Sequence, residues 1–187
     1  MSDFLKQQGN YRDLIAYKKA ECIYDITCHF AHRFLSVGDR TIDQMVQAAR
    51  SGKQNIAEGS AASTTSRETE IKLMNVAKAS FQELLIDYED YLRVRGLEQW
   101  EENSLKALQT RKVCSQHNDS AFYRNALPER TDETIANIAI TLLHQEDVFL
   151  RKLIDRLKDD FLRKGGIREE MSQARRKWRD NENNKQQ

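Results

Sequence analysis

Residues 66–96 read SRETEIKLMNVAKASFQELLIDYEDYLRVRG and carry the clearest structural signal in the chain. Apolar side chains recur there at steps of three and four residues, the period of one buried face of an α-helix. The residues of this face are Ile71, Met74, Phe81, Leu85, Tyr88 and Leu92, with Lys78 as the one polar intruder. We therefore predict a helix over residues 66–95, ended by Gly96 and roughly 45 Å long.

The apolar arc of this helix is wider than one packed face requires. Four further residues, Leu73, Ala77, Leu84 and Tyr91, extend it to roughly 160°, against the ~100° that faces a single core. Exposed apolar patches of that size mark contact surfaces, so we predict that these four residues form an interface between copies of the chain. Two intramolecular alternatives stay open, because residues 97–130 or the helix around Trp178 could cover the same arc.

The same periodicity predicts three more long helices, over about residues 13–36, 41–58 and 132–164, with 97–130 as a less regular excursion. A single proline, seven glycines and 32% charged residues suit long helices that face solvent. We expect an all-α, up-down-up-down four-helix bundle over residues 1–164, followed by a basic helical tail over 165–187.

The end of the second helix carries a candidate structural motif made of Arg50, Asn55, Glu58 and Gly59. Asn55 and Glu58 can bond to exposed backbone groups, and Gly59 can adopt the left-handed conformation that other residues resist. We therefore predict that this helix stops at Gly59.

The tail combines an apolar stripe with positive charge. Ile167, Met171, Ala174 and Trp178 lie at helical spacing, and residues 163–187 hold eight Lys or Arg against four Asp or Glu. The residues that could neutralise nucleic-acid phosphates are Arg168, Arg175, Arg176, Lys177 and Arg179. A pI near 7.7 for the whole chain instead favours a solvated helix docked by Trp178 and Met171. Residues 181–187 lack apolar groups and are predicted to be disordered.

Residue spacing argues against a metal or catalytic centre. No histidine follows a glutamate at the Glu-x-x-His spacing of di-iron bundles. Cys28 with His29 and His32, and Cys114 with His117, have spacings known among zinc ligands, but no CxxC pair accompanies them. We predict buried, reduced cysteines and no bound metal.

Two weaker signals point toward phosphate chemistry. Gly52-Lys53 lacks the earlier glycine, the following Ser or Thr and the preceding strand of a phosphate-binding loop. His144 could accept a phosphoryl group, but a lone helical histidine is more often structural. We predict no enzyme activity, no catalytic residue and no cofactor.

Targeting signals are not evident. No apolar run reaches the ~18 residues needed to cross a bilayer, and the start Met1-Ser2-Asp3-Phe4 lacks a basic region followed by an apolar stretch. We expect a cytoplasmic protein with no membrane contact.

The stretch from Gln44 to Gly59 resembles the hallmark of a bacterial four-helix bundle family first noticed in intervening sequences of ribosomal RNA genes. The matching residues are Ala49-Arg50-Ser51, Asn55-Ile56-Ala57-Glu58-Gly59, Tyr17-Lys18-Lys19-Ala20, Glu70, Leu73, Ala77, Ser80 and Glu83. Gly52-Lys53-Gln54 and the part from Leu142-Leu143-His144-Gln145 to Gly165-Gly166 are similar to the subgroup with a four-helix bundle suffix domain. Residues 97–128 match nothing in it, and the family's Ser-Ile-Pro is absent.

The resemblance implies an up-down-up-down bundle that assembles into homo-oligomers, with pentameric rings as the expected form. It also implies a possible role with RNA or DNA, because one relative is a basic accessory protein of retroelement reverse transcriptases. From the sequence we therefore expect a non-enzymatic, self-associating interaction or scaffold protein, with a nucleic-acid-binding accessory protein as the alternative.

Overall fold

A computed structural model describes residues 10–185 of the chain, and residues 1–9, including the N-terminal start considered above, lie outside it together with 186–187. The described part is all-α and contains no strand. Its helices are η1 (Tyr11–Asp13), α1 (Ile15–Phe34), α2 (Arg40–Ala62), α3 (Arg67–Arg95), α4 (Leu105–Gln116), α5 (Ser120–Ala126), α6 (Asp132–Lys164) and α7 (Ile167–Lys185). No helix in this range is long and apolar enough to span a bilayer.

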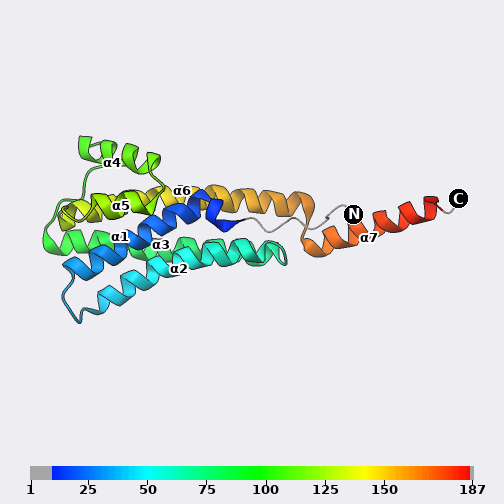
Figure 1. Ribbon diagram of the computed structural model, residues 1–187, viewed down its shortest axis with the longest axis horizontal. Helices are drawn as coiled ribbons and strands as arrows, with labels where there is room; N and C mark the ends of the chain where they lie inside the picture. The colour runs from blue at the N-terminus through cyan, green and yellow to red at the C-terminus, as the bar shows by residue number, and fades with distance from the viewer. Residues whose placement is uncertain (1–9, 186–187) are drawn as a thin grey trace.

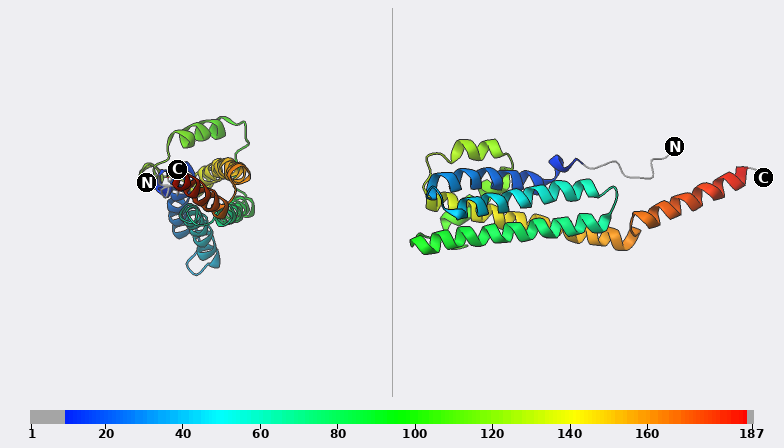
Figure 2. Two further views of the ribbon diagram at one scale, coloured as in Figure 1. Left: turned by 90° about the vertical axis from the view of Figure 1, so that its right-hand side faces the viewer. Right: turned by 90° about the horizontal axis from the view of Figure 1, so that it is seen from below.

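The four long helices α1, α2, α3 and α6 lie side by side and form what we call the helical body (Figure 1). Helix α1 packs against α2 and α6, and α3 packs against the same two helices from the other side. The short helices α4 and α5 lie on the outside, α4 against α6 and α5 against α1. Helix α7 extends beyond one end of the body, as Figure 1 and the right-hand view of Figure 2 show.

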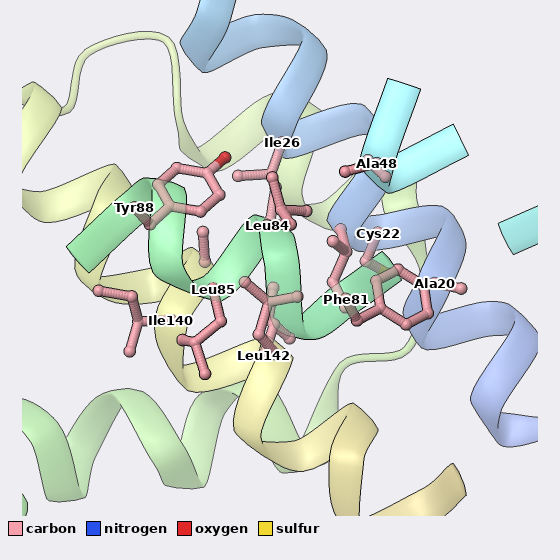
Figure 3. Close-up of a cluster of buried hydrophobic side chains, with 14 of the residues drawn as sticks. Ala20, Cys22, Ile26, Ala48, Phe81, Leu84, Leu85, Tyr88, Ile140 and Leu142 are labelled. Atoms are coloured by element: carbon pink, nitrogen blue, oxygen red, sulfur yellow. The ribbon is translucent and has the colours of Figure 1, made fainter. Parts of the chain in front are cut away.

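The core of the body runs between all four helices. Figure 3 shows Phe81, Leu84 and Tyr88 of α3 near Cys22 and Ile26 of α1, while Leu85 approaches Ile140 and Leu142 of α6. Tyr88 is fully buried, and its hydroxyl donates to Oγ1 of Thr27 at 3.1 Å. Helix α3 therefore buries side chains in two directions.

Helix boundaries follow local capping chemistry. Ser66 accepts a hydrogen bond from the Thr69 amide, Thr131 accepts one from the Thr134 amide, and Gly96 ends α3 in the left-handed conformation at φ +66°. The predicted ranges 66–95 and 132–164 thus agree with α3 and α6 to within one residue. The range 13–36 overshoots α1 by two residues at each end.

The prediction that α2 stops at a left-handed Gly59 is wrong. Helix α2 continues to Ala62, and Gly59 is an ordinary helical residue buried against α3. A Cβ atom built on Gly59 would lie 3.1 Å from Cε of Met74 and 3.3 Å from Cβ of Leu73. Glycine suits this position because two helices approach closely, and not because the chain turns.

The excursion over 97–130 is more ordered than the sequence indicates. Buried Asn137 on α6 accepts a hydrogen bond from the Trp100 amide at 2.8 Å and donates to the Glu98 carbonyl at 2.8 Å. These bonds fix the segment that leads into α4. The tail also differs from expectation, because helix α7 continues through residues 181–185, which were predicted to be disordered.

Gly52 generates the first prediction. A Cβ atom at Gly52 would lie 2.4 Å from Cζ of the buried Phe81 ring, closer than packed carbon atoms can be. Gly52→Ala should therefore lower the free energy of unfolding by about 1–3 kcal/mol, even though alanine is intrinsically the better helix former. Urea denaturation of the two proteins measures this difference.

The control is the same substitution in a Phe81→Leu background, where the ring no longer occupies that space. In that background Gly52→Ala should lower the free energy of unfolding by a smaller amount. The double-mutant cycle should therefore show coupling between positions 52 and 81. Equal costs in both backgrounds would contradict the steric explanation.

Candidate functional site

Helix α7 is the most exposed long helix of the fold. It follows Gly165 and Gly166, of which Gly165 has φ +74° and donates its amide to the Phe161 carbonyl at 2.8 Å. Beyond this joint Met171 and Trp178 are 49% and 65% exposed. A tryptophan exposed to that degree, on the same helical face as a methionine, is typical of a contact surface.

The first turn of α7 is tied to the body. Nη2 of Arg67, at the start of α3, lies 2.7 Å from Oε1 of Glu170, and only 10% of the Arg67 side chain is exposed. Ile167 and Glu170 line a cleft of about 440 Å³ between the ends of α2, α3 and α6. The stripe on α7 is therefore anchored at its beginning and exposed from Met171 onward.

The basic residues predicted to contact nucleic acid all lie on α7 and are exposed: Arg168, Arg175, Arg176, Lys177 and Arg179. At 3.6 residues per turn, Arg168, Arg175 and Arg179 follow one flank of the apolar stripe and Lys177 follows the other. The sequence placed these residues on one helix, and contact with nucleic acid stays a prediction. Docking by Trp178 and Met171 was the favoured interpretation, but the structure leaves both side chains exposed.

The predicted interface on α3 is corrected by the structure. Ala77 and Leu84 are fully buried, Tyr91 is 6% exposed, and the half-buried Leu73 lies against Gly59. The wide apolar arc is explained by packing against α2 on one side and α6 on the other. These four residues belong to contacts within the chain, so they do not offer a surface to a second copy.

Apolar residues that do face outward on α3 are few and separate. Val76, Ile86 and Val94 are exposed, and charged residues such as Glu83 and Asp90 lie between them along the helix. Single exposed apolar residues are normal on protein surfaces. The outward face of α3 therefore carries no signal for a partner.

The proposed motif around Gly59 is divided between core and surface. Asn55 donates to the Ser51 carbonyl at 2.8 Å and to Ser51 Oγ at 3.2 Å, and Ser51 Oγ lies 3.0 Å from Ser80 Oγ on α3. Asn55 therefore supports the contact between α2 and α3. Arg50 and Glu58 are exposed and do not take part in it.

A buried polar cluster lies where α1, α4, α5 and α6 meet, and sequence reasoning missed it. Lys19 is fully buried, and its ammonium group donates to the Cys114 carbonyl at 2.5 Å and to the His117 carbonyl at 3.3 Å. These carbonyls lie at the end of α4, where a cation also interacts favourably with the helix dipole. The hydroxyl of Tyr123 donates to the same His117 carbonyl at 3.0 Å.

Glu146 on α6 is also fully buried, and neither of its carboxyl oxygens has a hydrogen-bond partner among the described residues. Burial raises the pKa of Glu146 well above its usual range, although the nearby Lys19 opposes that shift. Burial likewise lowers the pKa of Lys19. The carboxyl group is therefore protonated over a wider pH range in the folded protein than in the unfolded chain.

The sequence contained a signal for this pair. Each residue occupies a position of its helix where the periodicity calls for an apolar side chain. Lys19 lies between Ala16 and Ile23 on this face, and Glu146 lies between Leu142 and Leu150. The intruder singled out instead, Lys78, is a half-exposed partner of Asp147 at 3.6 Å. A charged residue at an apolar position of a helix can be exposed at the surface or buried in the core. Only the packing of the neighbouring helices distinguishes the two cases.

Two cysteines in this part of the core, Cys22 and Cys114, are buried. Burial raises the pKa of Cys22 to about 12 and also raises the pKa of Cys114, so both remain protonated near neutral pH. Both are free thiols, as is the half-buried Cys28. Lys19 and Glu146 have no exposed surface through which a substrate could reach them. The cluster therefore serves to hold α4 and α5 in place.

The remaining sequence candidates are dispersed. The described residues include no group of three side chains that could hold a metal ion. His32 bonds through Nδ1 to the Cys28 carbonyl at 2.8 Å, and the His117 ring stacks on Phe122 at 3.8 Å between centroids. Gly52-Lys53 lies inside helix α2, which is no phosphate-binding loop. His144 is exposed on α6.

Comparisons with known proteins gave no match among family models, curated proteins or solved structures. The resemblance to the bacterial four-helix bundle family therefore remains a prediction.

The Glu146 carboxyl generates a prediction about pH. Folding raises the pKa of Glu146, so the folded protein holds this proton more tightly than the unfolded chain does. The free energy of unfolding therefore does not vary with the titration of this group below the unfolded pKa of ~4.3, where its contribution is complete, and decreases as pH rises from there toward the folded pKa. Glu146→Gln keeps the size of the side chain and removes this titration. The free energy of unfolding of the variant relative to wild type should rise as pH increases above the unfolded pKa, by at most about 1.4 kcal/mol per pH unit.

Urea denaturation at several pH values measures the slope. Glu83→Gln, at an exposed position on α3, is the matched control and should follow wild type. Parallel pH profiles for wild type and Glu146→Gln would contradict the prediction.

Proposed function

We propose that this chain is a non-enzymatic, self-associating interaction protein built as an up-down-up-down four-helix bundle, with helix α7 as its contact element. The observation that carries the proposal is the exposed stripe of α7, where Trp178 is 65% and Met171 49% exposed on a helix that leaves the body. The order in which α1, α2, α3 and α6 pack supports the bundle topology. The resemblance to a family of oligomeric bundles supports self-association, with a ring of five copies as the expected form.

The body itself supports an interaction role over catalysis. Its titratable core groups, Lys19, Glu146, Cys22 and Cys114, are buried among packed helices. The outward-facing apolar residues of α3 are single and separated by charges. Helix α4 also exposes apolar residues, at Leu105, Leu108 and Val113, but only on α7 do such residues lie on a helix that leaves the body.

The alternative function is a nucleic-acid-binding accessory role. The observation that favours it is the basic flank of α7, on which Arg168, Arg175 and Arg179 are all exposed. Phosphate neutralisation by such a row is independent of sequence and strongly salt-dependent. We place this function second because acidic residues on the same helix reduce its net positive charge. These residues are Glu169, Glu170, Asp180 and Glu182.

Self-association predicts a mass above that of one chain. Sedimentation of wild type at tens of micromolar should give a mass above 21.8 kDa, and Trp178→Glu should reduce it to 21.8 kDa without loss of helical circular dichroism. Leu105→Glu is the matched control, because Leu105 is an exposed apolar residue on α4, 78% accessible and away from α7. Wild type at 21.8 kDa throughout would refute the proposal.

The alternative function, nucleic-acid binding, predicts an affinity that depends on salt concentration. Binding to a labelled RNA or DNA oligonucleotide should weaken steeply with salt, and it should vanish when Arg175, Arg176, Lys177 and Arg179 become alanine. On the leading proposal we expect binding weaker than micromolar at physiological salt. Submicromolar binding that this variant abolishes would place the nucleic-acid function first.

A further inference from the structure

We propose that α7 pairs with α7 of a second copy of this chain as a short, parallel coiled coil with the two helices in register. This inference rests on the proposed self-association and specifies a two-fold dimer in place of the ring of five copies that the resemblance implies. The occupant of the exposed stripe is then the same stripe on another copy. The argument depends on the spacing of the apolar residues and on the charges that flank them.

The stripe has the spacing of a coiled-coil seam. Ile167, Met171, Ala174, Trp178 and Asn181 follow one another at steps of four, three, four and three residues. This alternation is the seven-residue repeat in which two core positions face the partner helix. Met171 and Trp178 occupy one core position of the repeat, and Ile167, Ala174 and Asn181 occupy the other.

The flanking charges are complementary in the parallel arrangement. In a parallel pair, the residue just before the core position of Met171 and Trp178 faces the residue five places later on the other helix. For α7 these pairs are Glu170 with Arg175 of the second copy, and Lys177 with Glu182 of the second copy. Both pairs join opposite charges and occur twice by the two-fold symmetry. Because Glu170 already bonds to Arg67, Lys177 with Glu182 is the pair that lies in the exposed part of the seam.

The antiparallel arrangement is less favourable. There each flank of the seam faces the same flank of the partner helix. With the exposed parts of the two helices aligned at their middles, Arg175 faces Arg175 of the second copy, and Lys177 faces Lys177 of the second copy. Like charges in such positions repel. The same alignment also places Arg168 opposite Glu182, so the two like-charge contacts are what count against the antiparallel orientation, and the charge pattern of α7 favours the parallel one.

The anchoring of the first turn limits the strength of the pairing. Ile167 and Glu170 contact the body, where Glu170 already bonds to Arg67 at 2.7 Å, so the exposed part of the seam begins at Met171. From there to Glu182 the helix spans only ~18 Å. An interface this small belongs to the weak, concentration-dependent class. Association should therefore appear at micromolar concentrations and dissociate on dilution.

Disulfide trapping tests the orientation. Ala174→Cys, in a Cys28→Ser background that removes the half-buried native thiol, places two thiols in one core layer of the parallel pair. Oxidised glutathione should then link the two chains through position 174. Arg176→Cys, on the opposite side of α7, is the control and should remain unlinked.

A mixture of two variants detects the antiparallel pair. With the helix middles aligned as above, position 171 of one chain would share a core layer with position 181 of the other. A Met171→Cys chain mixed with an Asn181→Cys chain, both in the Cys28→Ser background, would then form a mixed disulfide. In the parallel pair these positions lie ten residues apart along the seam, ~15 Å, which no disulfide spans.

Charge exchange supplies a second, independent measurement. Lys177→Glu places like charges opposite each other in two symmetry-related pairs and should raise the dissociation constant about tenfold. Adding Glu182→Lys to it restores opposite charges, so the double variant should return to within about twofold of wild type. Arg179→Glu makes the same change in charge outside the pairing positions and should have the smaller effect.

The outcomes separate this inference from the proposed function. A wild type that stays monomeric overturns both. A wild type that associates, but forms no link through position 174 and shows no recovery in the double variant, overturns the parallel pair and leaves self-association intact. A mixed disulfide between the Met171→Cys and Asn181→Cys chains overturns it in favour of the antiparallel pair. Linking at position 174 together with recovery establishes it.

Discussion

Helix α3 is covered on two sides, by α2 and by α6, and much of the remaining structure is arranged to permit this. The approach of α2 depends on residues without side chains, since the Phe81 ring occupies the space beside Gly52 and Met74 the space beside Gly59. The approach of α6 uses Leu85 and Leu142 (Figure 3). Because both faces of α3 pack within one chain, its wide apolar arc is buried in contacts with α2 and α6. Outside the body, helix α7 exposes Met171 and Trp178.

Local signals were enough to find the long helices. The three- and four-residue period placed α3 and α6, and Gly96 marked the end of α3. The period reports how wide an apolar arc is but not how many helices cover it, so Ala77, Leu84 and Tyr91 were assigned to a surface when they belong to the core. The prediction that Gly59 ends α2 was wrong for a related reason. A glycine near a helix end can serve a turn or a close contact, and only the neighbouring helix distinguishes them.

Contacts between distant residues set the parts that sequence reasoning missed. The order of residues 97–130 comes from Asn137 on α6 and Lys19 on α1, each of which bonds to residues far from it in sequence. Helix α7 was readable as an amphipathic basic helix, but its exposure depends on the joint at Gly165 and on the ion pair between Arg67 and Glu170. Lys19 and Glu146 stand in apolar registers and each has an environment that disfavours its charge. Lys19 bonds to the carbonyls of Cys114 and His117, and these bonds specify where the excursion docks.

The contact between Gly52 and Phe81 has a consequence for the history of this fold. The two positions share one volume, so a side chain can be gained at 52 only if the ring at 81 is lost or reduced. Drift at either position alone passes through a destabilised intermediate. Related chains should therefore show correlated changes at these sites, with glycine beside an aromatic ring in some lineages and a larger residue beside a smaller aliphatic one in others. Such covariation would identify descendants of the same packing arrangement even after the rest of the sequence has diverged.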